Sequence, residues 1–316
     1  MILILKNKCV VVTGGAGFIG SNLVYALKKN NNVIVIDDLS TGNLKNIKDL
    51  IKNTEIEFIK GTITNLNFLK KTFKDVDYVF HLAAIPSVPR SIINPIKSNN
   101  TNINGTLNVL IAARDNNVKK VIYSSSSSVY GDTPTLPKKE EMKPSPLSPY
   151  AVCKLTGEYY CQVFKEVYNL STICLRYFNV YGPRQDELSE YAAVIPKFIT
   201  KISNNKSPII YGDGKQTRDF TFVTDAINAN ILAARSKETG VFNIACGKRI
   251  SINDLAKTIM NLVGIKLKAT YMEIRPGDIR HSIADISKAK QKLGYEPKIT
   301  VRDGLKETIK WFQKQK

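Results

Sequence analysis

A glycine loop near the N-terminus, TGGAGFIG, carries Gly14, Gly17 and Gly20 at regular spacing. It follows the apolar run Cys9–Thr13, which predicts a buried strand, and precedes a helical pattern over residues 21–30. In such a turn, one glycine permits the tight bend and another lets backbone N–H groups approach a pyrophosphate. A third lets helix and strand pack closely. The loop therefore predicts an α/β fold that binds a dinucleotide at its first turn.

The second predicted strand, residues 33–37, ends in the acidic pair Asp37 and Asp38. An acid at this position can accept hydrogen bonds from the hydroxyls of an adenosine ribose. Its charge also repels a 2′-phosphate, so the sequence favours NAD over NADP as the cofactor. A glycine loop alone is a weak signal, but here strand, loop, helix, strand and acid occur in the expected order.

Short apolar runs alternate with longer helical patterns along the chain, which is typical of a parallel sheet covered on both faces. We predict an α/β fold: a doubly wound parallel (Rossmann) sheet with a smaller mixed α/β substrate-binding lobe. The predicted cofactor domain comprises residues 1–180 plus about 219–248, and the second domain about 181–218 plus 249–316, because loops become more frequent beyond Gly182. Further strands are predicted over 57–59, 78–81, 121–124 and 172–177, and helices over 102–116, 151–168, 225–234 and 252–263.

The formal net charge is +19, from 46 Lys+Arg against 27 Asp+Glu. Such an excess can indicate nucleic acid, an anionic membrane surface or small anionic substrates. The basic residues are spread along the chain, without a basic stripe interleaved with aromatic residues. We therefore expect a few arginines to serve an anionic ligand, and no nucleic-acid partner.

The five cysteines form no C-x-x-C pair, and the two histidines lie far apart in the sequence. No metal site is therefore expected. An odd number of cysteines without a secretory signal favours reduced thiols in the cytoplasm. The apolar N-terminus is interrupted by Lys6, Asn7 and Lys8 and is too short to cross a bilayer, so no membrane association is expected.

Tyr150 and Lys154 are four residues apart, in YAVCK, and would share one face of a helix. A lysine cation beside a phenol stabilises the phenolate and lowers the pKa of the tyrosine. Such a pair can act as general base toward an alcohol and general acid toward a ketone. Upstream, residues 121–123 lead into the serine run 124–128 at the predicted carboxyl edge of the sheet, where ligands bind in such folds.

In this order and spacing, TGGAGFIG, SSSSSVYG and YAVCK resemble the extended short-chain dehydrogenase/reductase family. Further matching stretches are HLAA at 81–84, LRYFNVYG at 175–182, GDG at 212–214, RDF at 218–220 and RPGD at 275–278. Together they cover nearly the whole chain and resemble UDP-sugar 4-epimerases. SVPRS at 87–91 and YAAVIPK at 191–197 resemble the UDP-N-acetylglucosamine 4-epimerase branch in particular.

The resemblance implies three catalytic residues. Tyr150 would be the base and acid, and Lys154 would hold the nicotinamide ribose and lower the pKa of Tyr150. Ser126 would hydrogen-bond the reacting sugar oxygen, with Ser125 or Ser127 as substitutes.

The resemblance also implies NAD as cofactor and a UDP-sugar as substrate, so the second predicted domain would bind the UDP-sugar. Asn179, Arg218 and Arg275 would hold the diphosphate, because an arginine fork can donate two hydrogen bonds to phosphate oxygens. Tyr211 would lie against the uracil, and Asp278 would contact the uridine ribose. The residues implied to bind NAD are Gly14, Gly17, Phe18, Ile19, Gly20, Asp37, Asp38, Thr41, Gly42, Thr62, Ile63, Leu82, Ala83, Ala84, Thr101, Ser124, Tyr150, Lys154 and Tyr177. Those implied to bind the UDP-sugar are Ser87, Ser126, Tyr150, Asn179, Ala193, Val194, Tyr211, Arg218, Arg275, Asp278 and Ser282.

One position departs from the family. Gly61 at the third predicted strand is followed by Thr62, where the family often has an acid that contacts adenine. We expect weaker adenine recognition but not its loss.

The serine run separates the reactions found in the family. Related dehydratases carry an Asp-Glu pair in this segment, and sugar-acid decarboxylases carry a glutamate, whereas this sequence offers only serines. We therefore expect reversible C4 epimerisation of a UDP-hexose, either UDP-GlcNAc/UDP-GalNAc or UDP-Glc/UDP-Gal or both. The alternatives are a UDP-glucuronate 4-epimerase and a non-catalytic NAD-binding protein of the same fold. Intact Tyr150, Lys154 and Ser126 argue against the second alternative.

Two further expectations follow from the resemblance. At the position of Ser282, enzymes restricted to glucose and galactose substrates carry a tyrosine, and a small residue leaves room for an N-acetyl group. Family members usually form homodimers through two helices of the cofactor domain, here about 98–115 and 150–168.

Overall fold

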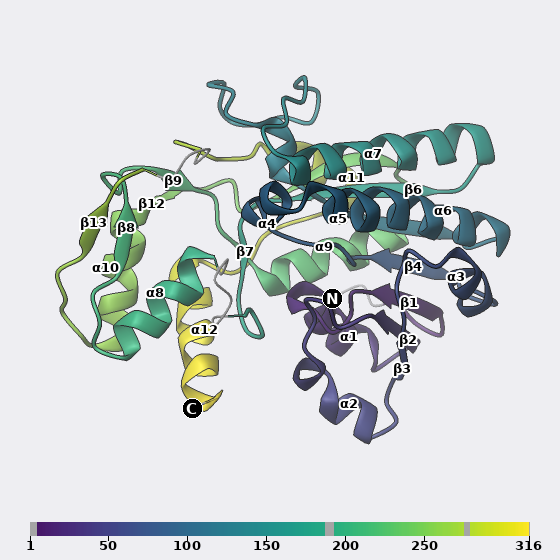
Figure 1. Ribbon diagram of the computed structural model, residues 1–316, viewed down its shortest axis with the longest axis horizontal. Coiled ribbons are helices and arrows are strands. Elements are labelled where there is room, and N and C mark those ends of the chain that lie inside the picture. Colours follow the sequence, from purple (N-terminus) through teal and green to yellow (C-terminus); the bar gives the residue numbers. More distant parts are fainter. Residues whose placement is uncertain (1–4, 187–192, 275–278, 316) are drawn as a thin grey trace.

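The computed structural model describes residues 5–186, 193–274 and 279–315, and its centre is a seven-stranded sheet (Figure 1). All neighbouring strands in this sheet are parallel, and their order is β3-β2-β1-β4-β5-β6-β11. The strands are β1 (Cys9–Thr13), β2 (Asn32–Asp37), β3 (Glu57–Lys60), β4 (Tyr78–His81), β5 (Lys120–Ser126), β6 (Thr172–Tyr177) and β11 (Gly240–Ile244). Strand order reverses between β1 and β4, which is where ligands bind in open sheets of this kind. The predicted doubly wound parallel sheet is confirmed.

Each strand contributes to two apolar cores, because successive side chains of a strand point to opposite faces. Val10 and Val12 of β1 belong to one core, and Val11 belongs to the other. Helices α1 (Phe18–Leu27) and α9 (Val223–Arg235) cover the first face. Helices α3 (Leu66–Thr72), α6 (Gly105–Asp115) and α7 (Pro149–Tyr168) cover the second. The apolar runs of the sequence are therefore strands buried on both sides.

Most predicted strands have bounds within two residues of those expected, and β5 shows the most useful difference. It continues to Ser126, beyond the predicted end at residue 124, because Ser125 and Ser126 pair with Arg176 and Tyr177 of β6. Helix α1 likewise begins at Phe18, directly after the glycine loop, and not at residue 21. The serine hydroxyls of β5 and the first N–H groups of α1 therefore lie nearer the carboxyl edge of the sheet than the sequence pattern indicated.

The helix predicted over 102–116 is the second half of a longer helical segment. Helix α5 (Pro95–Asn99) continues into η2 (Asn100–Asn104), a π-helical stretch, and then into α6. Four asparagines within residues 99–104 hide this continuity, because asparagine disfavours helix interiors. The short helices α2 (Lys48–Lys52) and α4 (Val88–Ile93) were not predicted.

A second group of elements lies beside the sheet, at the left of Figure 1. Helices α8 (Val194–Ser203) and α12 (Val301–Gln315) pack together and against α10 (Ile252–Val263). Three small sheets join β7 (Val180–Tyr181) to β10 (Thr221–Phe222), β8 (Ile209–Tyr211) to β13 (Thr270–Met272), and β9 (Thr217–Arg218) to β12 (Ile250–Ser251). Helix α11 (Ser287–Leu293) packs against α9 and β11. The domain boundaries proposed from the sequence stay a prediction.

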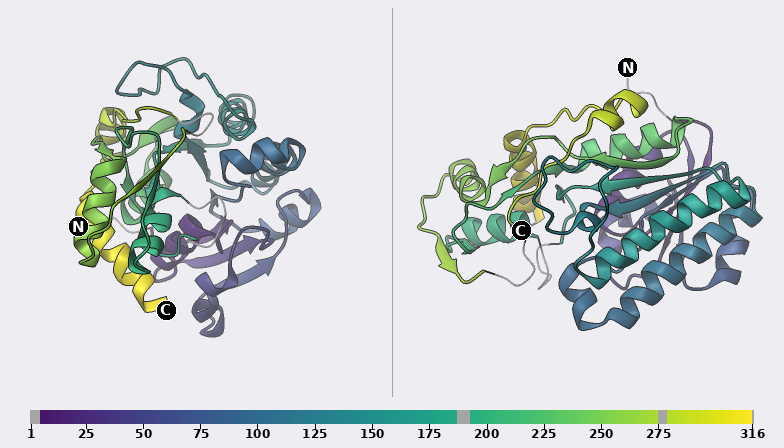
Figure 2. Two further views of the ribbon diagram at one scale, coloured as in Figure 1. Left: turned by 60° about the vertical axis from the view of Figure 1, so that its left-hand side comes forward. Right: turned by 90° about the horizontal axis from the view of Figure 1, so that it is seen from above.

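The two views of Figure 2 show α7 running alongside the segment from α5 to α6 on the outside of the sheet. None of the helices within the described ranges has the length and apolar character that a membrane span requires.

Candidate active site

Two glycines of the loop stand where a side chain has no room. Gly14 has a φ of +72°, and a Cβ there would lie 2.7 Å from the backbone nitrogen of Ala83, which follows β4. A Cβ on Gly20 would lie 2.1 Å from the carbonyl oxygen of Gly14. Gly17 caps α1 without a side-chain hydrogen bond, which leaves the first N–H groups of the helix without a side-chain cap, and residues 17–20 line the large cavity described below. This cradle fits the pyrophosphate of a dinucleotide, as the loop sequence predicts.

The acidic pair after β2 divides into a buried and an exposed carboxylate. Asp37 accepts hydrogen bonds from the backbone N–H groups of Ala16 at 3.0 Å and Leu39 at 2.8 Å. Burial raises the pKa of Asp37, and these two hydrogen bonds oppose the rise. Asp38 is exposed and accepts a hydrogen bond from the N–H of Ser40 at 2.8 Å. Asp37 therefore also fixes the loop around the expected ribose site.

A cavity of about 1180 Å³ extends from the glycine loop to Tyr150 and Lys154. Thr62 is the one predicted cofactor residue that does not line this cavity. The predicted residues that line it are Gly14, Gly17, Phe18, Ile19, Gly20, Asp37, Asp38, Thr41, Gly42, Ile63, Leu82, Ala83, Ala84, Ser87, Thr101, Ser124, Ser126, Tyr150, Lys154, Tyr177 and Ala193. Residues from nine segments of the sequence thus meet in one space large enough for a dinucleotide and a sugar.

Tyr150 and Lys154 project from the first turns of α7 toward the end of β5. Ser148 caps this helix by accepting a hydrogen bond from the N–H of Ala151 at 3.2 Å. Lys154 Nζ donates to the carbonyl oxygen of Ser124 at 2.7 Å and lies 5.8 Å from the ring centre of Tyr150. Ser126 is the serine of the run that lowers the pKa of Tyr150, which supports Ser126 over its neighbours as the partner of the tyrosine.

Burial dominates the protonation of this pair. It raises the pKa of Tyr150 to about 12, with the hydrogen bond to Ser126 opposing the rise. It lowers the pKa of Lys154 to about 8. Burial thus acts against the lowering of the Tyr150 pKa that the sequence led us to expect from Lys154.

His81 ends β4, within the electrostatic influence of Lys154, and has no functional role assigned from the sequence. Its Nδ1 is 2.8 Å from Thr13 Oγ1 and its Nε2 is 3.0 Å from Thr106 Oγ1. Burial, followed by the nearby charge of Lys154, lowers the pKa of His81 to about 3. The ring is therefore neutral and joins β4, β1 and α6 under the site.

A second cavity of about 280 Å³ adjoins the first and shares Val180 and Ala193 with it. The predicted substrate residues that line it are Asn179, Ala193, Val194, Tyr211 and Arg218. Arg275 and Asp278 lie outside the described residues. Ser282 is buried and lines neither cavity, and its N–H donates to the carbonyl oxygen of Thr217 at 3.1 Å.

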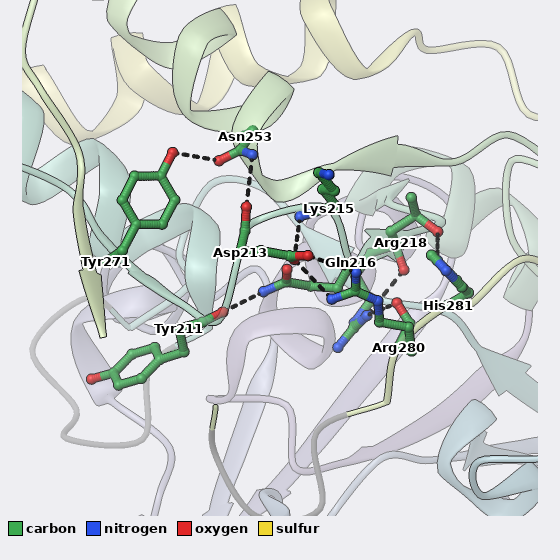
Figure 3. A network of polar contacts seen from close by, with 10 residues as sticks. Tyr211, Asp213, Lys215, Gln216, Arg218, Asn253, Tyr271, Arg280 and His281 are labelled. Carbon is green, nitrogen blue, oxygen red and sulfur yellow. Dashed lines mark hydrogen bonds and ion pairs between the residues drawn. The ribbon is translucent and has the colours of Figure 1, made fainter. Parts of the chain in front are cut away.

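The polar network around the second cavity is shown in Figure 3. Arg280 forms two hydrogen bonds of 2.8 Å with the carboxylate of Asp213, and this ion pair lowers the pKa of Asp213. Gln216 Nε2 donates to the carbonyl oxygen of Tyr211 at 2.7 Å. Arg218 Nη1 donates to the carbonyl oxygen of Thr217 at 3.0 Å. The network holds the backbone on both sides of Tyr211 and Arg218.

Asp219, next to Arg218, was given no role in the sequence analysis, but it is fully buried. Its carboxylate accepts hydrogen bonds from the N–H groups of Cys246 at 2.9 Å, Gly247 at 3.0 Å and Ala284 at 3.3 Å. Burial raises its pKa to about 6, and these hydrogen bonds oppose the rise. Asp219 thus joins three distant segments beside the second cavity, which no local sequence pattern reveals.

Other residues that line the larger cavity were also missed. Arg90 comes from α4, Arg184 follows β7, and Trp311, Phe312 and Gln315 come from α12. They approach the glycine loop only through the tertiary fold, so no spacing in the sequence connects them to it. Among the described residues, no group of three or more His, Cys, Asp or Glu side chains could hold a metal ion.

Comparison with known proteins gives consistent results. A family model described as GDP-mannose 4,6 dehydratase matches residues 11–308. A UDP-glucose 4-epimerase from Mycolicibacterium smegmatis is 37% identical over 308 residues, which cover 96% of this chain and 98% of that protein.

Solved structures extend this similarity. A UDP-N-acetylglucosamine 4-epimerase from Methanobrevibacter ruminantium, in complex with UDP-N-acetylmuramic acid, is 48% identical with a TM-score of 0.96, covering 99% of this chain and 100% of that one. A UDP-glucuronic acid 4-epimerase from Bacillus cereus, in complex with UDP-glucuronic acid and NAD, is 35% identical with a TM-score of 0.91, covering 97% of this chain and 99% of that one.

Proposed function

This chain belongs to the GDP-mannose 4,6 dehydratase family within the extended short-chain dehydrogenases/reductases, and from that premise we propose that it is an NAD-dependent UDP-sugar 4-epimerase. The observation that carries the proposal is the shared cavity, in which a dinucleotide cradle opens directly onto Tyr150, Lys154 and Ser126. The hydride acceptor must reach a sugar carbon while the proton acceptor reaches the hydroxyl on that same carbon, and a single shared cavity allows both.

The proposed reaction oxidises C4 of the sugar to a ketone and reduces it again from the other face. NAD, when bound, would supply the hydride acceptor and then the hydride donor. Tyr150 Oη takes the proton of the 4-hydroxyl and later returns it to the ketone oxygen. Ser126 donates a hydrogen bond to that oxygen, and the ammonium of Lys154 stabilises the phenolate of Tyr150.

The cofactor would be held along the larger cavity. Gly14, Gly17 and Gly20 would admit the pyrophosphate to the start of α1, while Asp37 and Asp38 would face the adenosine ribose. Thr62 does not line the cavity, so the backbone around it, and not its side chain, would border the adenine. Lys154 would hydrogen-bond the nicotinamide ribose.

The UDP group would occupy the second cavity. Asn179 and Arg218 line it and would hold the diphosphate, joined by Arg275, while Tyr211 would lie against the uracil. Asp278 would contact the uridine ribose. Because Ala193 borders both cavities, the sugar would lie near this residue and turn there while the diphosphate stays bound. Positioning of this kind needs one fixed anchor and one roomy space.

The accepted sugar is proposed to be N-acetylated, since the similar Methanobrevibacter protein is a UDP-N-acetylglucosamine 4-epimerase. Ser282 is small, as the resemblance implies for such enzymes, but it lines neither cavity. A UDP-glucuronate 4-epimerase is the second candidate. Arg90 favours it, because this residue places a cation along the cavity next to Ser87, where a sugar carboxylate could be bound.

We further propose that the enzyme is a cytoplasmic homodimer without a nucleic-acid or membrane partner. An exposed apolar patch on α4, α5 and α7 supports the dimer, since patches of this kind mark protein contacts. The patch comprises Ile92, Ile93, Ile96, Val152, Tyr159, Val163, Val167 and Tyr168.

The experiment that tests the function is incubation of the purified protein with UDP-glucose, UDP-GlcNAc and UDP-glucuronate, without added NAD, followed by resolution of the products. We expect 4-epimers to form without added NAD, because the bound cofactor is regenerated in each turnover. The reaction should be most rapid with UDP-GlcNAc. Tyr150→Phe should still bind the UDP-sugar but lose nearly all turnover. A requirement for stoichiometric NAD would instead indicate a net dehydrogenase, and near-normal turnover of Tyr150→Phe would exclude the assigned base.

A further inference from the structure

One face of α7 carries three polar residues at four-residue intervals: Tyr150, Lys154 and Glu158. This spacing places them one helical turn apart in a single row. Lys154 and Glu158 are almost completely buried, at 3% and 4% exposure. The mechanism above uses the first two and leaves the buried carboxylate of Glu158 without a role.

The row on α7 contacts three consecutive serines at the end of β5. Ser126 lies close enough to Tyr150 to lower its pKa, and Ser126 Oγ accepts a hydrogen bond from the N–H of Ser128 at 3.1 Å. Lys154 Nζ donates to the carbonyl oxygen of Ser124. Glu158 Oε1 accepts a hydrogen bond from Ser125 Oγ. Ser125 is 3% exposed, and its side chain points to the α7 face because strand residues alternate. The side chain of Ser125 is thus held by Glu158, and the next residue, Ser126, lies beside Tyr150.

The charge of Glu158 is balanced from the neighbouring strand. Arg176 of β6 pairs in register with Ser125, and its Nε and Nη2 donate to the two carboxylate oxygens of Glu158 at 2.8 and 2.7 Å. The Arg176 guanidinium also lies 4.6 Å from the ring centre of Tyr130, whose hydroxyl donates to Asn243 Oδ1 at 2.7 Å. Glu158 is therefore fixed on both sides and leaves the ammonium of Lys154 to serve the tyrosine.

A buried ion pair of this kind is not explained by stability alone. Removing two charges from water costs free energy that their attraction often fails to recover, and apolar residues of similar size would serve a core at least as well. The two hydrogen bonds from Arg176 nevertheless fix the orientation of the Glu158 carboxylate, although Arg176 Nη1 is buried without a hydrogen-bond partner among the described residues. The ion pair bonds Ser125, the neighbour of Ser126 in the proposed active site, and this location points to a role in the reaction.

We propose that Glu158 is a positioning residue: paired with Arg176, it holds Ser125 and so sets the position of Ser126 Oγ relative to Tyr150. The inference rests on the proposed function, because it gives Ser126 the task of binding the reacting sugar oxygen. Neither Glu158 nor Ser125 touches that oxygen. Their effect on the rate passes through Ser126.

The test uses Ser125→Ala, which removes the hydroxyl that Glu158 holds but leaves the Glu158–Arg176 ion pair in place. The matched control is Ser128→Ala in the same run, because Ser128 Oγ is buried without a hydrogen-bond partner among the residues that the structure describes. Ser125→Thr restores the hydroxyl. The measurements are kcat and KM with UDP-GlcNAc, the isotope effect on kcat with deuterium at C4, bound NAD per protein, and Tm.

For Ser125→Ala we expect about a tenfold loss in kcat, since a small displacement of a reacting group is enough for that, with KM changed less than about twofold. The isotope effect should rise, because hydride transfer becomes slower than the other steps. Ser128→Ala should resemble the wild type, and Ser125→Thr should recover most of the rate. Bound NAD should match the wild type in all three.

Three results would overturn the inference. The first is a wild-type kcat in Ser125→Ala, and the second is an equal loss of kcat in Ser128→Ala. The third is a loss of kcat in Ser125→Ala that is matched by a lower Tm or NAD content, with an unchanged isotope effect. Glu158→Gln gives a second test: it should show the same higher isotope effect in its folded fraction, and a wild-type value there would also contradict the inference. Absence of epimerisation in the wild type would remove the proposed function itself, which distinguishes the two failures.

Discussion

His81 shows how a single buried side chain ties the site to the fold. Both ring nitrogens are within hydrogen-bonding distance of threonine hydroxyls, Thr13 and Thr106, and the ring is 1% exposed. A proton added to this ring would place a second cation near Lys154, which contributes to the lowered pKa of His81.

This arrangement predicts how stability depends on pH. The pKa of His81 is about 3 in the folded chain and 6.5 ordinarily, so the unfolded chain binds the extra proton between these values. The His81 contribution to the unfolding free energy is therefore complete above pH 6.5 and is lost as the pH falls toward 3, by about 1.4 kcal/mol per pH unit. Denaturant unfolding of the wild type and His81→Gln at several pH values measures the difference. Parallel curves for the two proteins would contradict the prediction.

Ser282 bears on which sugars are accepted. Ser282→Tyr should lower activity on UDP-GlcNAc at least about tenfold more than activity on UDP-glucose, because an added ring takes the volume that an acetamido group needs. Because Ser282 is 8% exposed and lines neither cavity, the test also shows whether a side chain at this position reaches the sugar. Ser282→Ala, which changes little volume, is the control. Equal losses on both substrates would show that this position does not select the sugar.

Residues within contiguous motifs could be assigned from the sequence, and those joined only by folding could not. Tyr150 and Lys154 are linked by helical spacing, and both line the cavity as predicted. Glu158 follows the same spacing, but its partners Ser125 and Arg176 come from two other strands. Its carboxylate is connected to the serine run only by the packing of α7 on β5, and to Arg176 only by the pairing of β5 with β6.

At the scale of elements, α7 has two distinct faces. Its inner face carries the row Tyr150, Lys154 and Glu158, and its outer face carries exposed apolar residues such as Val163 and Val167. The apolar patch continues onto α5, where Ile96 is 80% exposed. An apolar face of this extent favours a protein contact, and the proposed one is a second copy of the chain.

The dimer prediction is tested by placing a charge in that patch. Val163→Glu should raise the dimer dissociation constant at least about a hundredfold, since a carboxylate would be desolvated at the interface. Met272→Glu puts the same charge on an exposed apolar residue of β13, outside the patch, and should leave the dimer intact. Sedimentation velocity over a range of concentrations gives the constants. If Val163→Glu remains as dimeric as the control, α7 is not the interface.

Most strands of the central sheet were predicted, but β11, the long helix α12 and the shortest strands were not. The strands of the central sheet are continuous apolar runs because both of their faces are buried, and α10 has the bounds predicted from its apolar spacing. By contrast, the strand pairs β9–β12 and β7–β10 are two residues long and join segments far apart in the sequence. No periodic pattern can develop in two residues, so the second group of elements was predicted only as a lobe.

At the scale of the molecule, the topology brings the chemistry together. Strand order reverses between β1 and β4, so the glycine loop after β1 and the turn after β4 meet at Gly14 and Ala83. Strand β5, next in the sheet, ends in the serines, and α7 lies across it. The larger cavity is therefore a consequence of the sheet order, which explains why its predicted residues come from so many segments.

The central claim is that the hydride removed from C4 returns to the same carbon. The most direct measurement is the fate of deuterium in a UDP-sugar labelled at C4, followed by mass spectrometry and NMR of the product formed without added NAD. The 4-epimer should keep the deuterium at C4 and take up no solvent hydrogen there. Loss of the label to water would contradict the account, because it would mean that C4 gives up a proton and not a hydride.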